Sequence, residues 1–436
     1  MSSSPPEPRG PAGAPALAAE QLKEVPAPFP GIVWIALLLE FLERFAYYGT
    51  AINLSVYLSE NCGMNDVQSG ELMAWFALVR SWLPVPVGSF ADRLLGFKAA
   101  LVLSFVLYVG AYLCLYLFPS HVGAWFAVLS IGIAGAFLKP VIPATVRRAS
   151  PPERRAMGFS LFYASVNAGS VFGKTLAKLI RTVASLRATI LDAIGACVVA
   201  LALTVALFKE PKAAPEAKGT TPDKPGEREG PFWDLLRGLA NPALSIFLVL
   251  IAGYYLCSEQ FYQTFPKYIQ RVFGDDAPRE YISLINPAAI ALFQVVMTRL
   301  TKGLPSLFSI AAGAVVAALA MLLMGSLSTS LWGACASFFV FAFAEMLIAP
   351  RYYEFISSFA PKGREGMYMG VAIVPAGIGG LVGGYLSGAL IEKWLPKVGA
   401  RDPFAIWSTY AVIGLGCALL LFGYAFILRK LRRAPV

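Results

Sequence analysis

A group of ionisable and hydroxyl-bearing residues interrupts an otherwise apolar segment near the N-terminus. Glu40, Glu43, Arg44 and Tyr47 are spaced three or four residues apart, so they would lie along one stripe of a helix. Ionisable side chains inside a membrane segment are energetically costly and by default mark a functional site. Two acids and one base on one face therefore predict a water-lined cavity. In that cavity one acid pairs with Arg44 and the other takes up a proton.

Further polar and charged residues lie within later apolar segments, namely Arg80, Lys139, Tyr163, Asn167, Lys174, Glu259, Asn286 and Glu345. Lys174 follows Asn167 by about two helical turns, which returns it to nearly the same face. If Arg80 and Lys174 line the cavity, they make its potential more positive and favour anionic substrates or acidic peptides. Arg181 is expected to extend toward the outer membrane interface, and Lys178 is left open between the cavity and that interface.

The composition indicates an integral membrane protein. Of the 436 residues, 57% are hydrophobic and 14% are charged, whereas soluble domains carry about 25% charged residues. The net charge is +10, but the Lys and Arg residues gather at alternate ends of the apolar segments. That distribution is typical of membrane topology rather than of nucleic-acid binding. The sequence contains no nucleophile–base set and no metal-ligand cluster, so neither an enzyme nor a metal or organic cofactor is expected.

Twelve apolar segments approach or exceed the roughly 20 residues that cross a hydrocarbon core. They are expected at residues 31–59, 68–92, 97–118, 122–147, 157–184, 186–208, 243–271, 279–300, 305–328, 331–358, 366–392 and 403–428. The predicted fold is an all-α membrane protein in which two bundles move about a midplane site. The expected units are a disordered cytoplasmic tail without signal-peptide features (1–30), a six-helix bundle (31–208), a polar cytoplasmic linker (209–242), a second six-helix bundle (243–428) and a basic tail (429–436).

The distribution of positive charge in the short loops predicts the orientation. One alternating set of loops holds most of the bases, at Arg93, Lys98, Arg147, Arg148, Arg154, Arg155, Arg299, Lys302, Lys362 and Arg364. The opposite loops mix acids with bases. The positive-inside rule therefore predicts a multi-pass protein of the cell membrane with both termini in the cytoplasm.

Two glycine-containing segments concern the packing of the bundles. Residues 88–98 read GSFADRLLGFK, which resembles the loop motif of the major facilitator superfamily, with the one-residue-longer spacing of its peptide transporters. Asp92 and Arg93 in this loop could pair across a moving bundle interface, so a gating role is predicted for them. Gly380, Gly384 and Gly388 recur every four residues in the eleventh segment and predict a close helix–helix contact.

The first apolar segment carries a more specific resemblance. Residues 40–49 read EFLERFAYYG and match, at every specified position, the E-x-x-E-R-F-x-Y-Y-G signature of the proton-coupled oligopeptide transporters (POT/PTR family). Other segments resemble the same family over nearly the whole membrane domain: 135–140 (GAFLKP), 159–170 (FSLFYASVNAGS), 259–260 (EQ), 285–287 (INP), 345–350 (EMLIAP), 360–361 (AP) and 369–370 (MG). The resemblance implies a major facilitator fold of about twelve transmembrane helices.

The resemblance also implies how protons would be coupled to movement of the bundles. Glu40 and Glu43 would take part in proton coupling beside Arg44. Glu259 would alternate as the partner of Lys139 or Arg44 and so act as a gate, together with Lys139. The proton would be the coupling ion, with no other cofactor.

Substrate-binding roles follow from the resemblance in the same way. Arg44 and Lys139 would face a peptide carboxylate, and Glu345 would bind the α-amino group. The side chains expected to hydrogen-bond the peptide backbone are Tyr47, Tyr48, Tyr163, Asn167 and Asn286.

The expected function is proton-driven symport of di- and tripeptides or peptide-like compounds by alternating access. The expected partners are the substrate, protons and the lipid bilayer, without nucleic acid, and the protein is expected to be a monomer. One alternative keeps the fold and changes the substrate to an organic or inorganic anion or to acidic peptides. A second alternative is a transporter-like sensor without transport, although a sensor needs no titrating acids.

Overall fold

The computed structural model describes residues 28–90, 95–210, 239–359 and 371–431, and this part of the chain contains only helices. The first half forms seven α-helices and one short 3-10 helix. They are α2 (Gly31–Glu60), α3 (Asp66–Trp82), α4 (Pro84–Phe90), α5 (Phe97–Leu117), α6 (His121–Ala149), η2 (Pro152–Arg154), α7 (Arg155–Val183) and α8 (Thr189–Leu207). Asp92 and Arg93 lie outside the described residues, so their predicted gating role stays a prediction.

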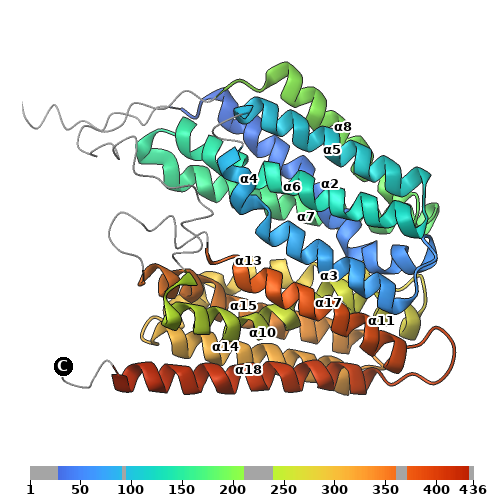
Figure 1. Ribbon diagram of the computed structural model, residues 1–436, viewed down its shortest axis with the longest axis vertical. Helices are drawn as coiled ribbons and strands as arrows, with labels where there is room; N and C mark the ends of the chain where they lie inside the picture. Colours follow the sequence, from blue (N-terminus) through green and yellow to red (C-terminus); the bar gives the residue numbers. More distant parts are fainter. Residues whose placement is uncertain (1–27, 91–94, 211–238, 360–370, 432–436) are drawn as a thin grey trace, which may run out of the picture.

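The second half repeats the pattern of long helices joined by short connections. Its helices are α10 (Pro242–Gln263), α11 (Phe265–Phe273), α12 (Arg279–Ile282), α13 (Ile285–Leu300), α14 (Ser306–Ser326), α15 (Leu331–Ser357), α17 (Val374–Trp394) and α18 (Pro403–Leu431). Each half encloses a hydrophobic core of its own. Figure 1 shows the two groups of helices side by side, with α3 and α17 at the boundary between them.

Each of the twelve expected segments coincides with one helix or with two consecutive helices. The second segment breaks at Leu83, between α3 and α4, and the seventh breaks at Thr264, between α10 and α11. In the described part of the chain, nine helical segments are long and apolar enough to cross a membrane. α2 and α7 are not among them, although they are the longest helices of the first half together with α6. α2 carries Glu40, Glu43 and Arg44, and α7 carries Lys174, Lys178 and Arg181, and these ionisable residues lower the mean hydropathy of the two helices.

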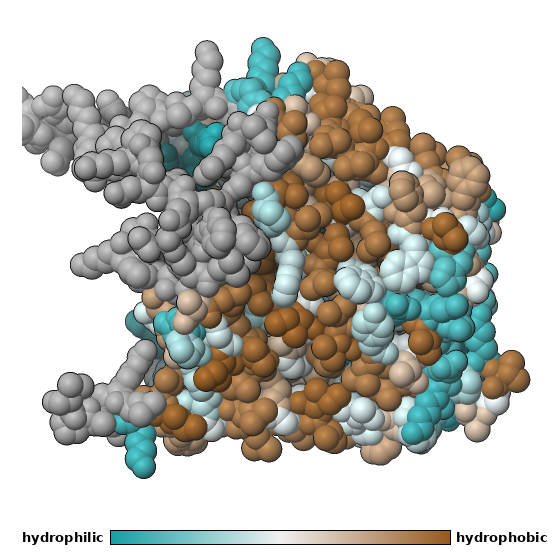
Figure 2. All heavy atoms as spheres, viewed as in Figure 1, coloured by the Kyte–Doolittle hydropathy of each residue, from teal (hydrophilic) through white to brown (hydrophobic). Residues whose placement is uncertain are grey.

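Many large hydrophobic side chains are exposed on the outside of the helix assembly. Figure 2 shows a broad hydrophobic belt over the helices and a hydrophilic rim at one end. Such a belt suits a protein in contact with lipid acyl chains. In keeping with the orientation predicted from the loop charges, the end at which α2 begins and α18 ends is called the inner end below, and the end at which α2 finishes is called the outer end.

Glycines let the site-bearing helices approach closely. A Cβ on Gly169 of α7 would lie 2.6 Å from the carbonyl oxygen of Phe41, and one on Gly173 would collide with the carbonyl of Phe45, both in α2. On α17, a Cβ on Gly384 would lie 2.5 Å from the backbone nitrogen of Ala74 in α3. The predicted close contact of the glycine stripe is therefore confirmed, and it joins the two halves.

Candidate functional site

The stripe on α2 brings two acids and one base together. The Nε of Arg44 lies 3.1 Å from Oε1 of Glu40 and 2.5 Å from Oε2 of Glu43. The two glutamates are 3% and 1% exposed, so this is a nearly water-free cluster. The hydroxyl of Tyr108 on α5 donates to the other carboxylate oxygen of Glu43 at 2.6 Å. Arg44 thus pairs with both acids in this structure, where the spacing had predicted a pair with one.

A second charged group links the halves through Arg80 on α3. Its Nη2 lies 2.7 Å from Oε1 of Glu259 on α10, and its Nη1 donates to the Tyr47 hydroxyl at 2.7 Å. The ammonium of Lys139 donates to the backbone carbonyl of Arg80 at 2.9 Å. That carbonyl has no helical donor four residues on, because Pro84 lacks an N–H.

The partner predicted for Glu259 is therefore wrong in this structure. Lys139 or Arg44 was expected, and Arg80 takes the place of both. The physical reason is occupancy: Arg44 is held by the two acids of its own helix, and Lys139 is held by the carbonyl beside the proline break. Arg80 is the cation whose side chain reaches the second half at this level.

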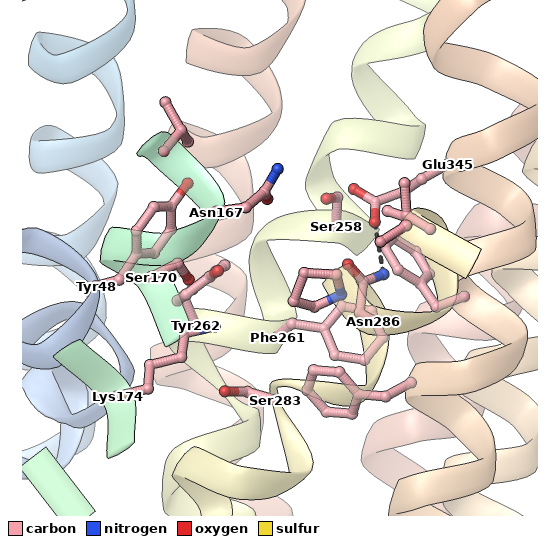
Figure 3. A pocket seen from close by; sticks show the side chains of 16 residues that line it. Tyr48, Asn167, Ser170, Lys174, Ser258, Phe261, Tyr262, Ser283, Asn286 and Glu345 are labelled. Atoms are coloured by element: carbon pink, nitrogen blue, oxygen red, sulfur yellow. Dashed lines mark hydrogen bonds between the residues drawn. The ribbon is translucent and has the colours of Figure 1, made fainter. Parts of the chain in front are cut away.

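A cavity of about 250 Å³ lies between the halves (Figure 3). Its polar lining residues are Tyr48, Asn167, Ser170 and Lys174 from the first half and Ser258, Tyr262, Ser283, Asn286 and Glu345 from the second. The amide of Asn286 donates to Oε2 of Glu345 at 2.5 Å. A carboxylate and an ammonium therefore occupy opposite walls of one small chamber. The described part of the chain contains no group of three or more His, Cys, Asp or Glu side chains that could hold a metal ion.

Tyr48 connects this cavity with the charged cluster on α2. The Arg44 guanidinium carbon lies 6.0 Å from the centre of the Tyr48 ring. The ammonium of Lys174 lies 5.4 Å from the same ring centre and 5.6 Å from that of Tyr262. Cations this close to aromatic rings are attracted to them. One aromatic side chain thus separates the acid–base cluster from the chamber.

Only some of the predicted substrate-binding residues line the cavity. Tyr48, Asn167, Asn286 and Glu345 line the cavity, as does Lys174, whereas the other predicted ligands are not among its lining residues. These others are Arg44, Tyr47, Lys139 and Tyr163. Arg80, one of the two possible extra cavity cations, also lies outside the lining, in its ion pair with Glu259.

The outer ends of the two halves are joined by charged contacts. Arg181 on α7 pairs with Glu280 on α12 through two contacts of 2.6 and 2.8 Å. The ammonium of Lys178 donates to the backbone carbonyl of Asp276 at 2.9 Å. The expected extension of Arg181 toward the outer membrane interface stays a prediction, and its side chain is only 6% exposed because it meets an acid of the other half.

Asp66, at the start of α3, is the centre of a second outer contact. Its carboxylate accepts hydrogen bonds from Lys267 at 2.9 Å and from Arg271 at 2.7 and 2.9 Å, both on α11. Arg279 of the second half donates to the Asn53 side chain of α2 at 2.7 Å. All of these contacts lie at the outer end, so this end of the cavity is closed.

Comparison with known proteins identifies a family model that matches this chain and solved structures that share its fold. The family model described as "Major Facilitator Superfamily" matches residues 36–384. A solved structure of a POT family transporter in complex with 5-aminolevulinic acid shares the fold with a TM-score of 0.73, at 19% identity, over 91% of this chain and 96% of that one. Multidrug resistance protein MdtH of Salmonella typhi is 24% identical over 379 residues, which is 86% of this chain and 89% of that protein.

Peptide permeases share a shorter segment with this chain. Dipeptide and tripeptide permease B of Photorhabdus luminescens is 30% identical over 162 residues, which is 36% of this chain and 32% of the permease. The chain spans between about a fifth and a third of the length of the first curated relatives that it matches. The superfamily match, by contrast, extends over most of the chain and agrees with the all-helical, two-part architecture. This chain belongs to the Major Facilitator Superfamily.

Proposed function

We propose that this protein is a proton-coupled symporter of di- and tripeptides or peptide-like compounds that works by alternating access. It acts as a monomer in the cell membrane, with both termini in the cytoplasm and the proton as its coupling ion. Peptide permeases are among its sequence relatives, and POT family transporters are among the solved structures that share its fold.

The observation that carries this proposal is the chamber between the halves with opposite charges on facing walls. Glu345 and Asn286 can receive the ammonium group of a zwitterion, and Lys174 supplies a positive charge across the chamber. Asn167 and Tyr48 add hydrogen-bonding groups. A peptide carries one charge of each sign, so it satisfies both walls at once.

Charge counting supports proton coupling at the α2 cluster. With every group ionised, Glu40, Glu43 and Arg44 carry a net charge of one negative unit in a buried site. One added proton makes the cluster neutral and removes the cost of an uncompensated buried charge. Because the Tyr108 hydroxyl bonds one oxygen of Glu43 and Arg44 bonds the other, loss of charge on Glu43 weakens its hold on Arg44. Arg44 then stays paired with Glu40 alone, as a neutral pair beside the Tyr48 ring.

The closed outer end supports an inward-facing arrangement. In the proposed orientation the inner end, which includes Lys98, Arg147 and Arg148, faces the cytoplasm. Substrate would enter from outside after the outer contacts of Asp66 and Glu280 separate. The halves would then rock about the chamber, as two-bundle transporters do.

A carrier of organic anions is the second candidate. The observation in its favour is the ammonium of Lys174. The chamber's described lining residues from the first half include this cation and no acid. Glu345 on the facing wall argues for the zwitterion, because a simple anion would be repelled by it.

The test is uptake of labelled dialanine into proteoliposomes with an imposed inward proton gradient. Dialanine should accumulate above its external concentration, and a protonophore should abolish that accumulation. The Glu43→Gln protein should lose concentrative uptake and keep counterflow, because it binds peptide without a proton-accepting carboxylate. Absence of gradient-driven accumulation of any peptide would rule out the symporter, and binding without transport would favour the sensor.

A further inference from the structure

The ammonium of Lys174 is a buried charge whose neighbours leave it incompletely satisfied. Lys174 on α7 is 2% exposed and belongs to the cavity wall (Figure 3). Within the described residues it makes no ion pair shorter than 4.0 Å and no recorded hydrogen bond, and its close contacts are the ring faces of Tyr48 and Tyr262. Ring faces offset only part of the cost of removing an ammonium from water. Such a group calls for an anionic partner.

The nearest opposite charge does not supply that partner. Glu345 on α15 acts on Lys174 through space, but its carboxylate is bonded to Asn286 on the opposite side of the chamber. Figure 3 shows Lys174 and Glu345 on facing sides, with Asn167 and Ser170 beside the path between them. Both charges line the same cavity, so a ligand with one anionic and one cationic end can contact both.

The other buried cations of this region are already bound. Arg44 pairs with two acids of its own helix, Arg80 pairs with Glu259, and Lys139 bonds a backbone carbonyl. Lys174 is the cation in the chamber lining, and within the described residues it has neither an ion pair of this kind nor a bond to a backbone carbonyl. A carboxylate that enters the chamber therefore meets Lys174 without first breaking an existing ion pair.

We propose that Lys174 is the carboxylate-binding subsite of the chamber, and that the preferred substrate is a short zwitterion bound between Lys174 and Glu345. This inference rests on the proposed peptide symport and changes the carboxylate partner that the resemblance implied, which was Arg44 with Lys139. Ligand pockets commonly have volumes of about 300–1,000 Å³. The cavity of about 250 Å³ lies just below that range, which fits a small ligand.

The experiment compares ligands that lack either the carboxylate or the free amino group of dialanine. Purified wild-type protein and the Lys174→Met and Lys174→Arg variants are titrated with dialanine, dialanine amide and N-acetylalanine, with binding followed by scintillation proximity competition. Wild-type protein should bind dialanine at least tenfold more tightly than its amide. Lys174→Met keeps the length of the side chain and removes the charge, so the preference for dialanine should fall to about twofold or less. Lys174→Arg should restore most of it.

The matched control is Lys178→Met, one helical turn away on the same helix. Lys178 bonds a backbone carbonyl at the closed outer end and does not line the chamber, so its variant should keep the wild-type preference. An unchanged preference in Lys174→Met would overturn the subsite. The subsite would also be overturned if Lys178→Met lost the preference for dialanine over its amide to the same extent as Lys174→Met.

Failure of this inference is distinguishable from failure of the proposed function. Wild-type protein that binds N-acetylalanine through Lys174, but accumulates no dialanine under a proton gradient, would overturn peptide symport and leave the subsite standing. Gradient-driven dialanine uptake that is as strong in Lys174→Met as in the wild-type protein would overturn the subsite and leave peptide symport standing. If Lys174→Met binds neither peptide ligand, recovery of the preference in Lys174→Arg supports the subsite and its absence overturns it.

Discussion

Arg80 and Glu259 form the ion pair that joins the halves closest to the chamber. Both side chains are partly buried, 23% and 17% exposed, so their attraction is screened less than that of a surface pair. Arg80 also bonds the Tyr47 hydroxyl, which ties the pair to α2, the helix that carries Glu40 and Glu43. A change at the α2 cluster can therefore reach the contact between the halves through one side chain.

Reversal of the charge on one partner of this pair should impair transport. Arg80→Glu places two acids together and should lower the initial rate of proton-driven uptake at least tenfold. The double variant Arg80→Glu, Glu259→Arg restores opposite charges and should recover a part of that loss, because contacting residues commonly couple by about 0.5–3 kcal/mol. The measurement is a double-mutant cycle on uptake rates in proteoliposomes.

The control for this cycle is a pair within one helix at the inner end. Arg351 and Glu354 lie 2.7 Å apart on α15, and their side chains are 18% and 55% exposed respectively. Glu354→Gln should change uptake less than twofold, because its carboxylate is largely exposed and does not join the halves. A double variant that is no faster than the slower single variant would contradict the importance of the Arg80–Glu259 pair.

At this scale the sequence predicted the residue types well and their partners less well. The stripe of Glu40, Glu43 and Arg44 could be predicted because helical spacing alone brings such neighbours together. The partner of Glu259 could not, because it depends on which cation has a spare donor after packing. Tyr108 was missed altogether, since a tyrosine in an apolar helix looks like a packing residue until the buried acid opposite it is known.

Helix contacts without side chains decide how closely the halves approach. Gly70 and Gly384 face each other across α3 and α17, so that a Cβ on Gly70 would lie 2.5 Å from the carbonyl oxygen of Gly384. Two helices can slide or rock at such a contact because no side chain interlocks there. The contact lies on the boundary between the halves (Figure 1).

Replacement of Gly384 by valine should disturb this contact. The new side chain would meet the backbone of Ala74, and overpacking of this kind typically costs about 1–3 kcal/mol. The expected result is a lower melting temperature in detergent together with slower uptake. Gly416→Val on α18 is the matched control, because nothing lies within 4 Å of a Cβ at that position. Equal melting temperatures for the two variants would show that α3 and α17 do not depend on the close approach.

The helices themselves could be predicted more fully than their breaks. Long apolar runs give the twelve segments, because each must satisfy its backbone within the bilayer. The interruptions at Leu83 and Thr264 were not predicted, although Pro84 and Pro266 stand directly beside them. The first break has a chemical consequence, since it leaves the Arg80 carbonyl free for Lys139.

For the whole molecule, the described ion pairs between the halves lie at two levels. One is the Arg80–Glu259 pair, and the others, at Asp66, Glu280 and Glu60, hold the outer end. The sequence predicted two halves and a central site, but not which end is closed. That choice depends on small free-energy differences between two packings of the same helices.

Asp66 is the outer residue whose removal should shift this balance most. Asp66→Asn leaves Lys267 and Arg271 near each other without their common counter-charge, which destabilises the closed outer end. The population open to the outside should rise by about tenfold for each 1.4 kcal/mol of destabilisation. A Ser283→Cys reporter in the chamber measures this, through its rate of labelling by a membrane-impermeant maleimide added from outside. The same protein without the reporter gives the background from the native cysteines.

Glu60→Gln provides the comparison for this prediction. Glu60 also pairs across the outer end, with Lys397 at 3.2 Å, but both side chains are exposed, 41% and 49% respectively. Because water and salt screen that pair, its loss should leave the labelling rate within about twofold of the parent. Labelling that is equally slow in Asp66→Asn and Glu60→Gln would mean that the buried Asp66 contact does not hold the outer end closed. Faster labelling in Asp66→Asn alone would identify it as the contact that must break before substrate enters from outside.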